Sequence, residues 1–427
     1  MAKEKILFIS HDPFSDVGSN GKTYSSLFSD FENNEIAQLY FNRLLPSSQK
    51  FNNFFKVTDI DIMKYLFTFS GNKITGVVQK EQIDKNIKAK VVKRSLLKSE
   101  LIKLLRNFLF SIIKVPNLKS FISWIEDFKP TVIFCVCSNY LFVYKMLAEI
   151  SKKYDIPYYI YFTDDYHIYN DGKNYFTKFI HNRFVEKTKK VVLGAEELFV
   201  IGPKMKIEYE QYFSKKSTIL INAVSLGELP PMKTQIGSPT TFRYFGWLHS
   251  DRSSSLSYLG KCLKYINDTY DQNCILEVYT FSQPTGRTKS DLTIDTIKLC
   301  EPLVGKDLKD KLTSSDFLVH AESFESEGTQ IMMLSVSTKI PEYLLSNCCI
   351  VAVGPSELAS IDLLEINKLG IVLSNKKSIE QHADKIFNVM KDLELYNDYC
   401  KKSINYCEKV FDAVKMRKQL KNKLLKI

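Results

Sequence analysis

Short apolar runs that alternate with longer amphipathic segments constrain the fold of this chain more than any other feature. In the first half such runs, all rich in β-branched or aromatic side chains, cover residues 5–10, 131–137, 157–163, 197–202 and 217–222. A strand is apolar along its whole length when helices cover both faces of its sheet, as in parallel α/β sheets. The pattern therefore predicts a doubly wound α/β domain.

The alternation restarts after residues 222–241, a segment rich in Pro, Gly and Thr that is the best candidate for a linker. The predicted elements there are strands at 241–248, 274–281, 316–322 and 348–354, an apolar segment at 296–303, and helices at about 253–268, 306–313, 339–346 and from 357 onward. The 427 residues exceed the roughly 300 at which a single core stops growing. We therefore expect two Rossmann-like domains, 1–222 and 223–405, that face each other across a cleft, a favoured place for ligands.

Cysteine usage and the N-terminus indicate a cytoplasmic protein. Several of the nine cysteines lie inside apolar runs, where free thiols behave as small hydrophobic groups, and no CxxC pair is present. The apolar run at residues 6–9 is too short for a secretory signal. We therefore expect free thiols and no metal site.

The net charge of +11 is concentrated in two segments. Residues 80–120 hold eleven basic against three acidic side chains, and residues 401–427 hold nine against two. Within a basic helical segment at about 80–125, an apolar face recurs at helical spacing and consists of Leu101, Leu104, Leu105, Phe108 and Ile112, with Lys103 and Arg106 away from it. Such a helix is typical of proteins that lie on an anionic membrane, here its inner surface. The alternative is a solvated face with the apolar stripe in the core. We do not expect nucleic-acid binding, because no motif for it is present.

Residues 18–23, Gly-Ser-Asn-Gly-Lys-Thr, end like a nucleotide-binding P-loop. A P-loop requires a glycine at position 16, which is Asp16. What remains is a strand, a glycine-containing loop and a helix beginning near Lys22. Several residues of this region are candidates for contact with a phosphate or with a substrate. They are Gly18, Ser19, Asn20, Gly21 and His11. A flexible loop is the alternative.

Residues 161–170, Tyr-Phe-Thr-Asp-Asp-Tyr-His-Ile-Tyr-Asn, place two carboxylates and an imidazole after a predicted strand. Asp164, Asp165 and His167 suit hydrogen bonds to a substrate hydroxyl or general-base catalysis. Aspartates also commonly form turns at strand ends, so a structural role is the alternative.

Three motifs in the second half carry a family resemblance. Gly246 follows a strand and precedes Arg252 by six residues, Ser315-Asp316 precedes Glu325, and Ser337-Thr338-Lys339 precedes Glu342 in the pattern S-x-K-x-x-E-Y-L. This order resembles the donor-binding domain of GT-B glycosyltransferases, specifically the retaining, family 4-like enzymes of bacterial surface polysaccharide and capsule synthesis. The first half is similar to the same family through its opening strand and glycine loop and through residues 197–205.

The resemblance implies a GT-B fold whose last helix, here 406–427, returns to the N-terminal domain. The residues that it assigns to the donor site are Arg252, Lys339, Glu342, Ser337, Thr338 and Gly246. Arg252 and Lys339 would bind the diphosphate, helped by the amides of a helix start that Ser337 or Thr338 would cap, so that no metal or other cofactor is needed. Glu342 would bind the ribose, and Glu325 the donor sugar or the reaction centre.

The chain departs from the family pattern at three places. Trp247 stands where an arginine is usual, Glu325 and Glu342 are separated by a longer interval than usual, and Asp164 and Asp165 precede His167 where the family often has a histidine. Asp165-Tyr-His167 also bears a weaker similarity to an acceptor-side motif of trehalose-phosphate synthases.

The sequence thus predicts a cytoplasmic, peripherally membrane-associated glycosyltransferase of the hexosyltransferase type. Its donor would be a nucleotide sugar, and its acceptor a lipid-linked or polysaccharide precursor of a cell-surface glycan. Two alternatives stay open. One is a catalytically silent GT-B protein that binds glycan or a sister transferase, and the other is a sugar-nucleotide epimerase.

Overall fold

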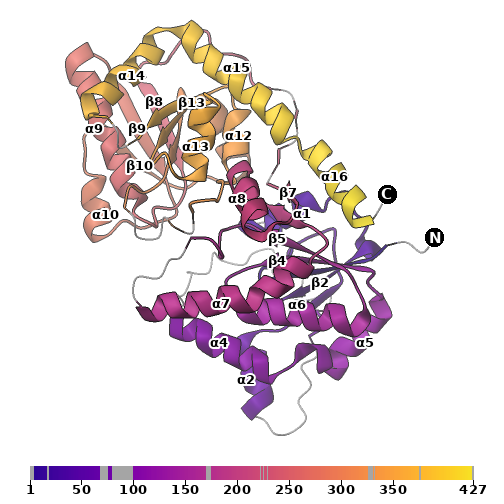
Figure 1. The fold of residues 1–427 in the computed structure, drawn as a ribbon. Coiled ribbons are helices and arrows are strands. Elements are labelled where there is room, and N and C mark those ends of the chain that lie inside the picture. Colours follow the sequence, from indigo (N-terminus) through magenta and orange to yellow (C-terminus); the bar gives the residue numbers. More distant parts are fainter. Residues whose placement is uncertain are drawn as a thin grey trace. The chain divides into compact units, whose positions relative to one another are not determined.

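The structure is a computed structural model that describes residues 4–16, 19–67, 76–78, 100–169, 175–221, 223–224, 226–227, 229–325, 330, 332–374 and 377–425. The chain divides into two compact units, one formed by Met1–Asn222 with Val414–Ile427 and the other by Ala223–Ala413. Each unit is built on one parallel sheet that is flanked by helices (Figure 1).

The described part of the first unit contains a seven-stranded sheet with the order β3-β2-β1-β4-β5-β6-β7. Its strands are β1 (Ile6–Ser10), β2 (Ile36–Tyr40), β3 (Phe54–Lys56), β4 (Val132–Cys137), β5 (Tyr158–Phe162), β6 (Leu198–Val200) and β7 (Ser217–Ile219). The chain runs outward from β1 to β3 and then crosses back to β4. The direction of winding therefore reverses between β1 and β4, which are parallel neighbours.

The helices of the first unit are α1 (Ser19–Leu27), α2 (Asp59–Phe67), α4 (Glu100–Ile112), α5 (Lys119–Phe128), α6 (Leu141–Tyr154), α7 (Tyr175–Gly194), α8 (Pro203–Phe213) and α16 (Ala413–Leu425). Their buried faces follow from helical spacing, as in α5, where the buried residues are Phe121, Trp124, Ile125 and Phe128. The neighbouring helices α4, α6 and α7 lie side by side (Figure 1). The C-terminal helix α16 packs on this unit, where Tyr159 Oη donates to the Lys423 carbonyl over 3.1 Å.

The described part of the second unit contains a six-stranded sheet with the order β10-β9-β8-β11-β12-β13. Its strands are β8 (Thr240–Phe245), β9 (Cys274–Tyr279), β10 (Ile297–Cys300), β11 (Phe317–Ala321), β12 (Cys349–Val353) and β13 (Gly370–Leu373). Its helices are α9 (Arg252–Tyr270), α10 (Gly286–Asp291), α11 (Gly305–Thr313), α12 (Ile340–Leu344), α13 (Ala359–Ile366), α14 (Ile379–Lys391) and α15 (Leu393–Val410). Here the winding reverses between β8 and β11, which are again parallel neighbours.

The predicted α/β architecture with two doubly wound sheets is confirmed, but three strands escaped prediction. Strand β2 carries the polar Gln38 at its centre, which is buried because its side chain accepts from Phe14 N over 2.9 Å and donates to Ser10 Oγ over 2.8 Å. Strand β3 has three residues, and β13 lies in the stretch from 357 onward that was predicted to be helical. Helix α1 begins at Ser19, earlier than the predicted start near Lys22.

Among the described residues, no single helix is long and apolar enough to span a membrane. The helical stretches Lys103–Asn117 and Lys119–Phe128, bent by 55° from each other, pass that test of length and composition only when they are taken together.

Candidate functional site

Open α/β sheets bind ligands at the carboxyl ends of the strands between which the winding reverses. In the second unit these strands are β8 and β11. Strand β8 leads through Gly246 into a loop that ends at Arg252, the first residue of α9, and β11 is followed directly by Glu322. Gly246 and Arg252 of the predicted donor site therefore meet Glu322 at one edge of the sheet.

Arg252 and Glu322 form a buried ion pair at this edge. Arg252 donates to Glu322 Oε2 from Nη2 over 2.9 Å and from Nε over 3.2 Å. The main chain of Glu322 is held in turn, because its amide donates to the Val353 carbonyl and its carbonyl accepts from Ser255 Oγ over 2.6 Å. Loss of either partner would leave a buried charge without compensation, so the pair fixes the position of the guanidinium.

Glu322 is ionised at neutral pH. Burial alone would raise its pKa, but contact with His320 and the charge of Arg252 lower the pKa of Glu322 to about 2. His320 Nε2 lies 3.3 Å from Glu322 Oε1, and this buried nitrogen makes no well-aligned hydrogen bond within the described residues. Glu322 therefore serves as a fixed negative charge and not as a proton donor.

Lys339 brings a second cation to the same edge. Its Nζ donates to the Phe245 carbonyl over 2.5 Å and lies 5.6 Å from the centre of the Tyr244 ring. Burial and the neighbouring charge of Arg252 lower the pKa of Lys339 to about 8, although Glu322 and Glu342 act in the opposite direction. Gly246 makes room for this arrangement, because a Cβ at Gly246 would collide with Lys339 Nζ and with Tyr244 Oη.

The residues around Lys339 depart from the prediction in one respect. We expected Ser337 or Thr338 to cap the following helix, but the residue at the N-cap of α12 is Lys339, whose own side chain does not cap the helix. Helix α12 begins one residue later than a Thr338 cap would require, with Pro341 inside its first turn. Glu342 also lies in this turn and is half-buried, whereas Thr338 is exposed.

Glu325 lies apart from the buried ion pair. It accepts from Arg287 Nη2 over 2.7 Å, and the side chains of Arg287 and Glu325 are 64% and 46% exposed. The carboxylate that contacts Arg252 is Glu322, which sequence reasoning left unassigned. Its signal was its place as the last residue of the predicted strand 316–322. The longer interval that obscured the register runs through residues 327–330, of which residues 327–329 lie outside the described residues.

An exposed aromatic pair borders the same edge. Trp247 and Phe281, which follow β8 and β9, stack with ring centres 5.6 Å apart. Their side chains are 43% and 44% exposed. Trp247, the departure from the family pattern, thus offers a flat apolar face where the family has a charge.

At the corresponding edge of the first unit, His11 and Asp12 follow β1. Asp12 accepts hydrogen bonds from Asn20 (2.9 Å) and Asn42 (2.6 Å) and lies 3.1 Å from His11 Nδ1. Burial alone would raise the pKa of Asp12, but the contact with His11 and the two amides lower it to about 2.

His11 also contacts Arg106 of α4. Arg106 Nη1 lies 2.9 Å from His11 Nε2, while Nε donates to Asp59 over 2.8 Å and Nη2 to the Phe41 carbonyl over 3.0 Å. Because a guanidinium only donates, His11 Nε2 must accept, and the ring proton lies on Nδ1 toward Asp12. Arg106 was predicted to lie off the apolar face of its helix, and its spacing in the sequence gives no sign that its side chain is buried.

Asp165 and His167 form part of the fold of the first unit. Asp165 accepts from the amides of His167, Ile168 and Tyr169 and from Tyr209 Oη over 2.7 Å, which is the turn-forming role. His167 is buried among aromatic rings, its Nε2 lies 3.0 Å from Thr188 Oγ1, and burial lowers its pKa to about 3. Asp164 is half-buried and accepts from Tyr166 Oη over 3.1 Å. Their catalytic assignment gains no support from this geometry.

Of the predicted glycine loop, Gly18 lies outside the described residues. Ser19, Asn20 and Gly21 form the first turn of α1. A Cβ at Gly21 would meet the Pro13 carbonyl at 2.5 Å, so close packing of the loop on α1 is one reason for this glycine. Among the described residues, no group of three or more His, Cys, Asp and Glu side chains is placed to hold a metal ion. A metal-independent reaction stays a prediction.

No protein-family model matches the chain, and no curated protein matches it in sequence. Solved structures do share its fold. HepE of Anabaena in complex with UDP has 12% identity and a TM-score of 0.61, covering 99% of this chain and 100% of that one. An alpha,alpha-trehalose-phosphate synthase (UDP-forming) from Burkholderia vietnamiensis has 8% identity and a TM-score of 0.59, over 99% and 97%. Sucrose-phosphate synthase from Thermosynechococcus elongatus has 10% identity and a TM-score of 0.55, over 98% and 97%. At these identities the likeness shows the fold, and the chain has the GT-B fold of these enzymes.

Proposed function

We propose that the protein is a glycosyltransferase of the hexosyltransferase type, which moves a sugar from a nucleotide-sugar donor to an acceptor. The observation that carries this proposal is the pair of cations at the carboxyl edge of the second sheet. Arg252 is close enough to Lys339 for its charge to lower the lysine pKa. Two largely buried cations repel each other, and a bound diphosphate would remove that repulsion.

The structures that share the fold favour a uridine nucleotide as the donor. HepE of Anabaena was solved with UDP and with UDP-glucose, and the Burkholderia vietnamiensis enzyme is described as UDP-forming. In this chain the exposed stack of Trp247 and Phe281 would take the planar base, since aromatic faces stack on such rings. Glu342 would accept hydrogen bonds from the ribose.

Sugar transfer builds positive charge at the anomeric carbon and negative charge on the leaving diphosphate, and the site must stabilise both. Arg252 and Lys339 would stabilise the leaving group, while Glu322 keeps the Arg252 guanidinium in place. The ammonium group of Lys339 would donate hydrogen bonds to the diphosphate, so that no metal ion is needed there. Retention of the anomeric configuration is proposed from the family resemblance alone.

We further propose a lipid-linked or polysaccharide acceptor and a peripheral position on the inner face of the membrane. Helix α4 presents an apolar stripe to solvent that consists of Leu104, Leu105, Phe108 and Ile112, while Arg106 and Phe110 face inward. Leu105 and Phe108 are 56% and 60% exposed. The basic segment 80–99, which lies outside the described residues, leads directly into this helix. An apolar stripe beside basic groups suits an anionic bilayer.

Vesicle flotation tests the membrane part. We expect binding to vesicles that contain phosphatidylglycerol but not to pure phosphatidylcholine, and loss of binding in the Leu105→Glu/Phe108→Glu variant. Ile207→Glu, at another exposed apolar residue of the first unit, is the control for added charge. Equal flotation of the double variant and the control would contradict the proposal.

A thermal-shift panel of nucleotide sugars, followed by an assay of nucleotide release, tests the enzymatic part. A ligand at 100 times its dissociation constant stabilises the folded state by about 2.7 kcal/mol, so we expect a clear shift with UDP and UDP-glucose. A protein that responds to no nucleotide sugar would contradict the proposal. Conversion of a nucleotide sugar without an acceptor would instead support the epimerase.

A further inference from the structure

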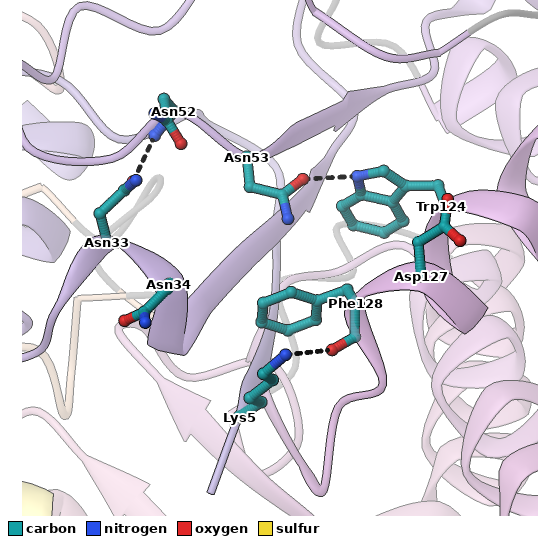
Figure 2. A pocket seen from close by; sticks show the side chains of 8 residues that line it. All are labelled: Lys5, Asn33, Asn34, Asn52, Asn53, Trp124, Asp127 and Phe128. Carbon is teal, nitrogen blue, oxygen red and sulfur yellow. Dashed lines mark hydrogen bonds between the residues drawn. The ribbon is translucent and has the colours of Figure 1, made fainter. Parts of the chain in front are cut away.

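The amino-terminal edge of the first sheet carries a pocket that the proposed reaction does not use. Its volume is about 320 Å³, and it is lined by Lys5, Asn33, Asn34, Asn52, Asn53, Trp124, Asp127 and Phe128 (Figure 2). This volume lies at the lower end of the range of about 300–1,000 Å³ for small-molecule sites. Strand β1 has five residues, so at about 3.3 Å per residue the pocket is roughly 16 Å from His11 and Asp12.

Two Asn-Asn pairs come together here because each precedes a strand of a parallel sheet. Asn33 and Asn34 stand before β2, and Asn52 and Asn53 stand before β3. The pairs are tied to each other, because Asn52 N donates to Asn33 Oδ1 over 2.9 Å. Asn53 is held as well, since its Oδ1 accepts from Trp124 Nε1 over 2.6 Å (Figure 2).

Most of the hydrogen-bond donors and acceptors on the side chains of these four asparagines are left for a ligand. The side chains of Asn34 and Asn52 make no hydrogen bond within the described part of the chain, and Asn53 keeps its Nδ2 donor. Each asparagine amide is planar and both donates and accepts. Such groups match vicinal hydroxyls, which also donate and accept.

The remaining lining argues for a neutral ligand. The single cation, Lys5, is already engaged, because its Nζ donates to the Phe128 carbonyl over 3.0 Å and lies 5.3 Å from the Phe128 ring centre. Asp127, the one carboxylate of the lining, balances the charge of Lys5 in the net charge of the pocket. Trp124 and Phe128 add an apolar floor. A phosphate or a nucleotide would find no available cation among these lining residues.

We propose that this pocket is a non-catalytic site for one neutral sugar unit of a glycan. The amides of Asn34, Asn52 and Asn53 would bind vicinal hydroxyls, and the edges of Trp124 and Phe128 would contact the apolar face of the ring. The site is independent of Arg252 and Lys339, which belong to the other unit. It would hold a glycan chain away from the reacting edge.

Trp124 can report on binding through its fluorescence. The chain has two tryptophans, so that Trp124 is the only one left in a Trp247→Phe variant. Glucose, galactose and N-acetylglucosamine are titrated into this variant while Trp124 emission is recorded. We expect a saturable change with at least one sugar, with half-saturation on the order of 1 mM for so small a ligand. Asn34→Ala and Asn52→Ala should each raise the half-saturation concentration at least threefold.

Asn117→Ala, an exposed asparagine of the same unit, is the matched control and should leave the titration unchanged. Circular dichroism establishes that each variant is folded. The proposal is overturned if Trp124 responds to none of the three sugars, if the two asparagine variants titrate like the control, or if glucose 6-phosphate binds more tightly than glucose. Lys339→Met should not alter this titration, so failure of the donor-site proposal would be visible separately.

Discussion

The carboxyl edges of the two sheets differ in how their charges are balanced. In the first unit, Asp12, His11, Arg106 and Asp59 form a continuous chain in which each charged group meets a partner. In the second unit, Lys339 Nζ donates only to a backbone carbonyl among the described residues, and Arg252 disfavours its charge. The charges of the first edge balance within the fold, whereas at the second edge Glu322 pairs with Arg252, and the Lys339 ammonium is left to attract an anion. The difference supports the proposal that the diphosphate would bind at the second edge.

The largest expected effect concerns the Arg252–Glu322 pair. Arg252→Met should lower the free energy of unfolding by about 3–5 kcal/mol, because it leaves the Glu322 carboxylate buried and unpaired. The double variant Arg252→Met/Glu322→Gln should recover most of this loss while still failing to bind UDP normally. Urea denaturation measures the stability. Equal losses in the single and double variants would show that the buried charge is not the cause.

The next effect is the pH dependence of UDP binding. Because the pKa of Lys339 is about 8, the lysine loses its charge as the pH rises above this value, and UDP affinity should fall by up to about tenfold per pH unit. The folded pKa lies below the ordinary 10.5 of lysine. The unfolded chain therefore binds more protons between these values, and this group's contribution to the free energy of unfolding rises with pH.

Calorimetric titrations of UDP between pH 7 and pH 9.5 measure this dependence. In Lys339→Met the fall with pH should disappear. A wild-type affinity that stays constant across this range would contradict the assignment of Lys339 to the diphosphate.

The smallest expected effect concerns the first edge. Arg106→Lys should change UDP affinity by less than about twofold, since the contacts of Arg106 lie within the first unit. It should lower the free energy of unfolding by about 1–2 kcal/mol, because lysine cannot make the three hydrogen bonds of the guanidinium at once. Nitrogen NMR of His11 should show the Nδ1-protonated tautomer in the wild type, because Arg106 donates to Nε2 and Asp12 accepts from Nδ1. A ring protonated on Nε2 would contradict the role given to Arg106.

The alternation of apolar runs was enough to predict two doubly wound sheets, because a strand covered on both faces must be apolar throughout. It failed for β2, where buried Gln38 is polar but fully hydrogen-bonded. Interior hydrogen bonding of this kind leaves no periodic trace in a sequence.

The candidate site was predictable to a similar extent. Arg252 and Lys339 were identified from the family spacing, and the structure brings them to one edge. Glu322 was missed in favour of Glu325, because spacing along the chain does not reveal which of two nearby carboxylates points inward. The burial of His167 escaped prediction for a similar reason, since a histidine that follows a strand looks the same in a sequence whether its ring is buried or exposed.

The central claim is that Lys339 and Arg252 bind the diphosphate of the donor. The most direct measurement is calorimetric titration of UDP into the wild type, Lys339→Met and the exposed control Arg287→Ala at pH 7. We predict that Lys339→Met weakens binding by about 1.5–3 kcal/mol, the usual value of a hydrogen bond to a charged group, and that Arg287→Ala binds within about twofold of the wild type. Wild-type affinity in Lys339→Met, or an equal loss in Arg287→Ala, would contradict the claim.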